Sequence, residues 1–246
     1  MRSAIHMILP AMLLTGACAT SEVAEEPEAD DDDTTALEQE YTVVVKARLA
    51  TDDPDLNQQA HDAVAGGAQE DAMALGDLSH FVFLGMEDEQ DFLAIDVWDN
   101  LENIPAFFEN PDVQQAFSSL FEAPPEVATY DRPEGYTSWG EMEIDDTTLV
   151  VTVEGTLALE TEDENLELHN EVAEAGREAA QALGDDAHLV YLDLADRRRF
   201  LAVDLWSDPE GMQTFFSDEE IRAAFASLFA EPPTVTVWLP SGYLQW

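Results

Sequence analysis

The chain has 246 residues, of which 46% are hydrophobic, so it can form one large domain or two domains of about 100 residues each. Its 54 acidic residues outnumber 9 basic residues and give a net charge of -45. A surface of this charge repels phosphate backbones and anionic lipid headgroups, which argues against nucleic-acid partners. We interpret the charge as an adaptation to high salt, where screening removes the self-repulsion; a cation-binding or anti-adhesive surface is the alternative.

The N-terminus has the composition of an export signal. Arg2 precedes an apolar run from Ile5 to Leu14, which is too short to span a bilayer but suits the hydrophobic region of a signal peptide. The run leads to Cys18, the only cysteine of the chain, so no intrachain disulfide can form. We therefore expect residues 1–17 to be a signal peptide.

The residues before Cys18 resemble the lipobox of bacterial lipoproteins. Leu14-Thr15-Gly16-Ala17-Cys18 places the cysteine at the position that is lipidated and becomes the first residue after cleavage, with Thr15 where leucine is commoner. The resemblance implies an acyl anchor of the palmitate type on Cys18. Ala19 after the cysteine implies sorting to the outer membrane, with the protein facing the periplasm or the cell surface. An ordinary secretory signal with an incidental cysteine is the alternative.

Residues 18–40 are expected to be an acidic tether. The segment contains an acidic run from Glu25 to Asp33, interrupted by Pro27 and Ala29. Such a run repels itself and cannot bury apolar surface, so we predict a disordered link between the lipid anchor and the folded part of the chain. Metal binding by the aspartates is the alternative.

The rest of the chain contains the same sequence twice. An offset of 108 aligns Gly76–Pro125 with Gly184–Pro233 without a gap and with 21 identities in 50 positions. Self-similarity at a fixed offset is the signature of repeated structural units. We therefore expect two tandem domains, over residues 41–139 and 148–246.

Each copy is expected to contain its elements in the order β-α-β-β-α-β. Alternation of apolar and polar residues indicates strands, and an N-cap aspartate followed by proline indicates a helix start. In the first copy we expect a strand over 43–49, a helix from Asp53-Pro54 to Leu75, a hairpin of 80–86 and 92–98, a helical region broken by Pro111, and a strand over 127–130. This order is that of a ferredoxin-like split βαβ unit.

The strand that ends in Asp96-Val97-Trp98, followed by Glu102, Phe107-Phe108, Asn110-Pro111 and Val113, resembles the antibiotic biosynthesis monooxygenase-like group of dimeric α+β barrels. The resemblance covers nearly all of each copy. It implies an α+β fold in which two sheets form a barrel around a cavity, here as a pseudo-dimer within one chain. Some members of the group are cofactor-free monooxygenases, some degrade heme, and many are uncharacterised.

Strand alternation gives the 92–98 strand two different faces. Leu93, Ile95 and Val97 form an aliphatic face, which we expect to pack on the helices. Asp96 and Trp98 share the other face, which we therefore expect to line the barrel.

A short hairpin can place His80 opposite Asp96 or Trp98, and the second copy repeats this arrangement with His188, Asp204 and Trp206. A histidine beside a carboxylate can act as a general base, for example toward a phenol or an activated carbon, which is the opening step of cofactor-free oxygenation. The alternative is a pair of side chains that satisfy each other's hydrogen bonds inside a packed barrel. We take His80, Asp96, His188 and Asp204 as the candidate catalytic residues.

Further candidates contact a ligand rather than react with it. His61 and His169 lie near the middle of the first helix of their copies, and Trp98 and Trp206 end the third strands. A half-buried helix histidine usually packs and forms one hydrogen bond, and a heme or metal ligand is the alternative. Lys46 corresponds to Glu154 in the second copy, which indicates either a salt bridge across the pseudo-dimer or one working and one decayed site.

The sequence contains no serine nucleophile elbow, phosphate-binding glycine loop or zinc-ligand spacing. We expect no metal and no cofactor. The leading hypothesis is an exported lipoprotein that binds an unknown small molecule in its barrel cavity, with a cofactor-independent monooxygenase-like activity left open. The alternative is a non-catalytic cell-surface module for binding or assembly on the same fold.

Overall fold

A computed structural model describes residues 39–246, so the expected signal peptide, Cys18 and nearly all of the acidic tether lie outside the described residues. The first copy contains β1 (Tyr41–Arg48), α1 (Pro54–Ala74), β2 (Asp77–Gly85), β3 (Asp91–Trp98), α2 (Asn103–Phe108), α3 (Pro111–Ser118) and β4 (Glu126–Asp131). The second copy contains β5 (Leu149–Thr156), α4 (Glu162–Ala182), β6 (Asp185–Asp193), β7 (Arg199–Trp206), α5 (Pro209–Ser217), α6 (Glu219–Leu228) and β8 (Thr234–Pro240). None of these helices is long and apolar enough to cross a membrane.

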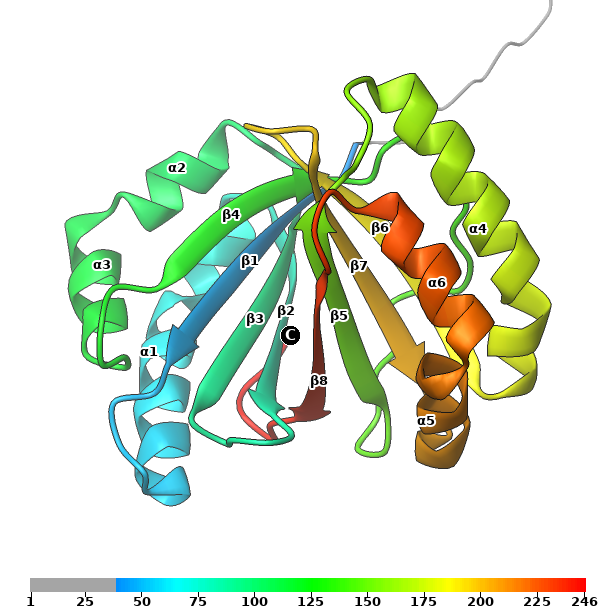
Figure 1. Ribbon diagram of the computed structural model, residues 1–246. Helices are drawn as coiled ribbons and strands as arrows, with labels where there is room; N and C mark the ends of the chain where they lie inside the picture. Colours follow the sequence, from blue (N-terminus) through cyan, green and yellow to red (C-terminus); the bar gives the residue numbers. More distant parts are fainter. Residues whose placement is uncertain (1–38) are drawn as a thin grey trace, which may run out of the picture. The chain divides into compact units, whose positions relative to one another are not determined.

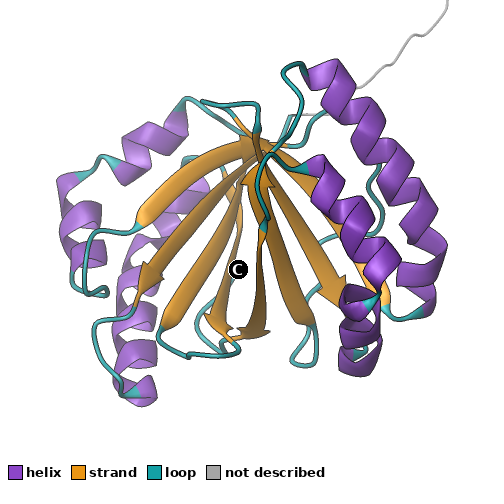
Figure 2. Ribbon diagram, viewed as in Figure 1, coloured by secondary structure: helices purple, strands orange, loops and turns teal. Residues whose placement is uncertain are grey.

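The strands form one closed antiparallel barrel in the order β1-β3-β2-β8-β5-β7-β6-β4. Each copy supplies four adjacent strands, and its helices lie on the outer face of those strands (Figures 1 and 2). The α+β fold class and the pseudo-dimeric barrel predicted from the sequence are therefore confirmed.

The two faces of each sheet are the reverse of our expectation. Leu93 and Ile95 of β3 pack inside the barrel against Leu201, Val203 and other residues of the second copy, not against the helices. Phe92, Ala94 and Trp98 pack instead with the helix residues Ile104 and Phe107. An eight-stranded barrel has an interior that side chains from both halves fill completely, so the uniformly aliphatic face belongs there.

Local signals at both ends of the first helix position the following strand. The Asp53 side chain accepts a hydrogen bond from the Leu56 amide at 3.2 Å, and Pro54 occupies the first turn. Gly76, just after the helix, has a φ of +104°, which side-chain-bearing residues rarely adopt. Gly184 repeats this conformation in the second copy, so both glycines turn the chain directly into the strand that carries the site histidine.

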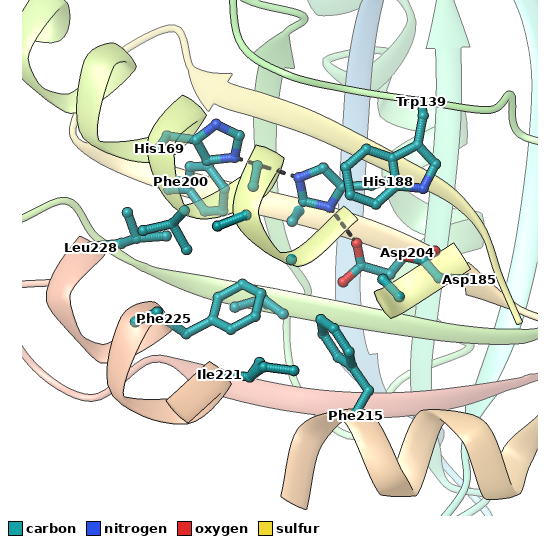
Figure 3. Close-up of a pocket in the computed structure, with 18 of the residues that line it drawn as sticks. Trp139, His169, Asp185, His188, Phe200, Asp204, Phe215, Ile221, Phe225 and Leu228 are labelled. Atoms are coloured by element: carbon teal, nitrogen blue, oxygen red, sulfur yellow. Dashed lines mark hydrogen bonds and ion pairs between the residues drawn. The ribbon is translucent and has the colours of Figure 1, made fainter. Parts of the chain in front are cut away.

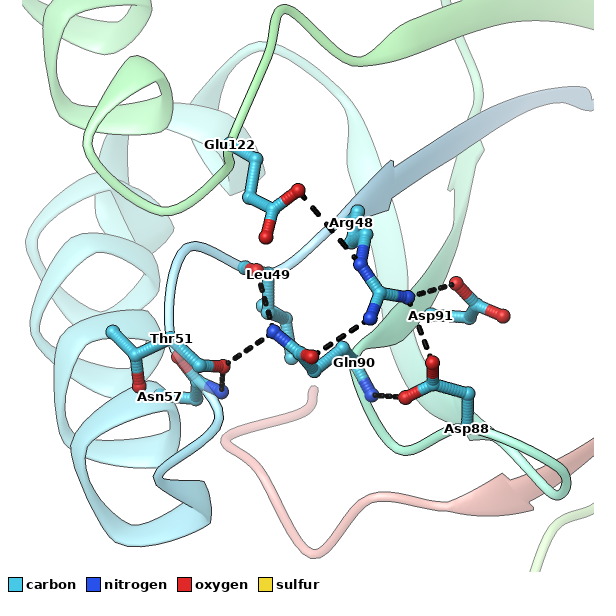
Figure 4. A network of polar contacts seen from close by, with 8 residues as sticks. All are labelled: Arg48, Leu49, Thr51, Asn57, Asp88, Gln90, Asp91 and Glu122. Carbon is cyan, nitrogen blue, oxygen red and sulfur yellow. Dashed lines mark hydrogen bonds and ion pairs between the residues drawn. The ribbon is translucent and has the colours of Figure 1, made fainter.

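Arg48 ties the end of β1 to the β2–β3 loop (Figure 4). Its guanidinium donates to Asp88 at 2.9 Å and to Gln90 at 2.7 Å, and the Gln90 amide donates to the Thr51 carbonyl at 3.0 Å. The second copy has Thr156 in place of Arg48, and Arg198, the counterpart of Gln90, there donates to the Leu157 carbonyl at 2.8 Å. Different residues therefore connect the same two segments in each copy.

Hydrogen bonds and ion pairs join the two copies. β2 pairs with β8, and β4 pairs with β6. Lys46 forms a salt bridge with Glu154, which confirms the salt bridge across the pseudo-dimer that we considered for this pair. Arg197 bonds Asp131 of the first copy at 2.6 Å. Several of the few basic residues thus neutralise acidic side chains at the junctions between copies.

Candidate functional site

Both predicted histidine–aspartate pairs are present. His80 and Asp96 are directly opposite each other on β2 and β3, with His80 Nδ1 2.5 Å from a carboxylate oxygen of Asp96. His188 and Asp204 have the same register and the same distance in the second copy. All four side chains are buried.

The pairs do not face the barrel interior, as we expected, but the space between each sheet and its own helices. His188 and Asp204 alternate with Leu189 and Val203, which fill the barrel interior. The helix side of the sheet tolerates the polar pair because α1 and α4 bring a second histidine to it. The prediction of polar pairs is confirmed, whereas the face assigned to them is wrong.

A second histidine extends each pair. His169 of α4 places its Nε2 3.4 Å from Nε2 of His188, with the two rings stacked at 5.6 Å between centroids. His61 of α1 does the same to His80, at 3.3 Å. Each copy therefore contains a continuous polar chain of aspartate, strand histidine and helix histidine.

The hydrogen-bond partners in the second copy define the positions of the protons. The Asn170 amide is oriented by donating to the Gly135 carbonyl at 2.8 Å and accepting from the Thr137 amide at 2.7 Å. Its oxygen lies 3.2 Å from His169 Nδ1, so Nδ1 carries the hydrogen. The Asp204 carboxylate likewise places a hydrogen on Nδ1 of His188. When both rings are neutral, their Nε2 lone pairs therefore face each other, and the pair is arranged to accept one proton between them.

The second imidazole stays neutral. Burial, reinforced by the charge of the neighbouring His188, lowers the pKa of His169 to about 4. Burial likewise lowers the pKa of His61 to about 4, against the opposing effect of its Asp62 hydrogen bond. His61 and His169 are therefore neutral at pH 7.

Each site is completed by the other copy. Trp139, at the end of the first copy, exchanges backbone hydrogen bonds with His188 at 2.9 and 3.0 Å and places its ring 4.6 Å from the imidazole. Trp246, at the end of the chain, pairs with His80 in the same way, with a ring distance of 4.5 Å. These crossed C-terminal tails were not predicted from the sequence, although the repeat of Gly-Tyr and Trp after each last strand was visible.

A pocket of about 230 Å³ lies between the sheet and the helices of the second copy (Figure 3). His169, His188 and Asp204 lie along one side of it, and Phe215, Ile221 and Phe225 lie on the other. A cavity of about 150 Å³ is sufficient to bind benzene, so this pocket can accommodate a substituted aromatic molecule. Trp206, a predicted ligand-binding residue, also lines it.

The corresponding space in the first copy is almost closed. It measures about 20 Å³, which is room for about one water molecule. His61, His80 and Asp96 line it together with Phe108 and Phe117. Trp98, a predicted ligand-binding residue, packs on Phe107 and Phe108. The two copies therefore share one polar chain but differ in the space beside it.

Two further buried carboxyl groups lie near the polar chains and were not predicted. Asp185 lines the pocket of the second copy, and Asp77 lines the small cavity of the first. Both follow the turn glycine and are identical between the copies, which was the available signal. Within residues 39–246, no group of three or more His, Cys, Asp or Glu residues is arranged to hold a metal ion.

No protein-family model and no curated protein matches the sequence. Solved structures do match the fold. A candidate monooxygenase from Fusobacterium nucleatum subsp. nucleatum superimposes with a TM-score of 0.55 at 11% identity, over 85% of this chain and 98% of that one. A candidate monooxygenase from Lactobacillus acidophilus gives 0.55 at 10%, over 85% and 100%. An anthrone oxidase-like protein gives 0.57 at 14%, over 85% and 93%. The chain thus shares the fold of these three solved structures.

Proposed function

We propose that the pocket of the second copy binds a small, largely apolar molecule and that the His188–His169 pair removes a proton from it. The observation that carries this proposal is an apolar pocket of about 230 Å³ whose polar side is the Asp204–His188–His169 chain. Asp204 orients His188 through the contact at Nδ1, and His169 supplies the second lone pair.

The first chemical step is proton abstraction from an acidic O–H or an activated C–H group of the bound molecule. The resulting anion is the species that reacts with dioxygen in cofactor-free oxygenation. The names of the structural neighbours favour that direction, although their identity to this chain supports the fold alone. A proton-transfer reaction without oxygen, such as an isomerisation, uses the same residues.

A non-catalytic binding module is the second candidate function. The observations that favour it are the packed interior of the barrel and the nearly closed cavity of the first copy. The two functions differ in the fate of the ligand, which a binding module releases unchanged.

Filling the pocket is expected to abolish ligand binding. Gly176 of α4 lines the pocket, and a Cβ added there meets its nearest neighbour, the Phe215 ring, at 3.8 Å. Gly176→Leu therefore places its side chain in the cavity and also improves helix propensity. Native mass spectrometry of the purified full chain should detect a co-purifying small molecule in the wild type and lose it in this variant.

The matched control is Gly67→Leu, the same change in α1 at a position where an added Cβ meets nothing within 4 Å. This variant should retain the molecule. Retention of the molecule by Gly176→Leu would instead show that it binds elsewhere.

We also propose that the protein is a lipoprotein anchored through Cys18 in the outer membrane, with its folded domains in the periplasm or at the cell surface. The support is the apolar run from Ile5 to Leu14, the lipobox-like residues before Cys18, and Ala19 after it. Cys18→Ser should abolish metabolic labelling with a fatty-acid probe and remove the protein from the membrane fraction. Unchanged membrane association of this variant would contradict the anchor.

A further inference from the structure

Asp185 is aimed at the pocket by an irregularity in β6. Residues 187, 189 and 191 of this strand face the barrel interior, and His188 faces the helices. Regular alternation would place Asp185 with the interior residues. The β6–β7 register shifts between Asp185 and Ala187, so one extra residue moves Asp185 to the face of His188. A bulge that redirects a side chain in this way is typical of functional sites.

The carboxyl group of Asp185 has unused hydrogen-bonding capacity inside the pocket. Its side chain is 5% exposed, lies beside Asp204 (Figure 3), and has an Oδ1 atom without a partner among the described residues. Burial, followed by the charge of Asp204, raises the pKa of Asp185 to about 9. At neutral pH the group is therefore a carboxylic acid that can donate a hydrogen bond.

The other unpartnered polar atoms of the pocket are also donors. Trp139 and Trp206 also line the pocket, and their indole N–H groups are buried without an acceptor among the described residues. A ligand that accepts a hydrogen bond from the Asp185 carboxylic acid must carry an acceptor oxygen.

We propose that Asp185 donates a hydrogen bond to an oxygen atom of the ligand, next to the hydrogen that the base removes. This inference rests on the proposed function of the pocket. It assigns the residue that binds the ligand oxygen, which the base alone does not define.

In a ligand whose oxygen is a carbonyl, the step is an enolisation. The imidazole pair takes the proton of the C–H group next to the carbonyl, and the electron pair of that bond forms the carbon–carbon double bond of the enolate. The carbonyl π electrons move to the oxygen, where the Asp185 O–H hydrogen bond stabilises the developing charge. Return of a proton from the imidazole pair restores the ketone, so no oxidant or reductant is consumed.

The test uses 2-tetralone, an enolisable bicyclic ketone, and tetralin, the same skeleton without oxygen. Binding of each to the purified full chain is followed by tryptophan fluorescence, and exchange of the ketone's α-hydrogens in D₂O is followed by proton NMR. We expect the wild type to bind both compounds and to catalyse exchange of 2-tetralone.

Asp185→Leu should slow the exchange about 100-fold, the usual effect of losing one oxyanion-stabilising donor, and should leave tetralin binding unchanged. Asp185→Asn keeps the size of the side chain and a weaker donor, so it should slow exchange by about 10-fold. Asp77→Asn, the matched change beside the closed cavity, should have no effect on exchange.

Exchange at the wild-type rate in both Asp185 variants, with tetralin still bound, would overturn the role of Asp185 and leave the proposed pocket function intact. Failure of the wild type to bind either compound would refute the proposed pocket function together with this inference. Loss of exchange in Asp77→Asn alone would place the reaction in the first copy and also overturn the proposal.

Discussion

Asp185→Asn is expected to raise the melting temperature at pH 8 by on the order of 10 °C. The pKa of Asp185 is about 9 in the folded chain, against an ordinary value of 3.8. At pH 8 folding must therefore keep a proton on a group that is ionised in the unfolded chain. This costs about 1.4 kcal/mol per pH unit above 3.8, or on the order of 6 kcal/mol. Asparagine has the same shape and no such cost, and a domain of this size gains roughly 2–4 °C per kcal/mol.

The sign of the effect depends on pH in a defined way. A carboxyl group with a raised pKa makes its full contribution to the free energy of unfolding below pH 3.8. This contribution is lost as the pH rises toward 9. The advantage of Asp185→Asn over the wild type should therefore be near zero at pH 4 and grow up to pH 9. The stabilisation by Asp77→Asn should depend on pH in the same way but reach a smaller maximum, because burial and Asp96 raise the pKa of Asp77 to about 8.

Thermal unfolding followed by circular dichroism at pH 4 and pH 8 measures both differences. Equal stabilisation at the two pH values would mean that the asparagine acts through packing, and a lower melting temperature at pH 8 would mean that the carboxyl group is ionised and well solvated. If Asp185→Asn also slows 2-tetralone exchange, the chain retains a destabilising acid because the reaction uses it.

The buried histidines contribute to the pH dependence with the opposite sign. His61 and His169, with pKa values of about 4, bind a proton less readily in the folded chain than in the unfolded chain. Their effect is a loss of stability as the pH falls from about 6.5 to 4. As the pH falls over the same interval, the contributions of Asp77 and Asp185 to the stability of the fold increase. Each variant must therefore be compared with the wild type at the same pH.

The repeat, the order of the elements and the histidine–aspartate pairs were predictable because they depend on local patterns. The 108-residue offset defines the two copies, and the two-residue period together with a short hairpin places His80 opposite Asp96. His80 and Asp96 are only 16 residues apart, so their pairing follows from local signals, and the repeat is visible by direct comparison of the two halves of the sequence.

We assigned the two faces of the sheet wrongly because the correct assignment depends on what packs against each face, a helix layer or the other sheet. An aliphatic row such as Leu93 and Ile95 fits a helix or a second sheet equally well. The closed barrel brings Leu201 and Val203 of the other copy against it, and only that long-range pairing makes the interior dry. The Asp185 bulge was missed for a related reason, since one extra residue reverses the alternation from which faces are assigned.

The crossed tails lead to the second large effect, in which a substitution in one copy changes the site of the other. Trp139 is 9% exposed and packs on His188, so Trp139→Ala should lower the free energy of unfolding by about 3–5 kcal/mol. Because an aromatic ring at 4.6 Å contributes strongly to the chemical shifts of the imidazole, the side-chain resonances of His188 should move while those of His80 stay in place.

Trp246→Ala provides the reciprocal experiment, because Trp246 packs on His80 at 4.5 Å. This variant should move the His80 resonances and leave His188 unchanged. Histidine side-chain NMR spectra of the two variants, with urea unfolding curves for stability, compare the two sites within one chain. Perturbation of His80 by Trp139→Ala, or of His188 by Trp246→Ala, would mean that each tail packs on its own copy. The reciprocal pattern would instead show that neither pocket is complete without the other half of the chain, because in this arrangement a tandem fusion supplies what two subunits of a dimer would exchange.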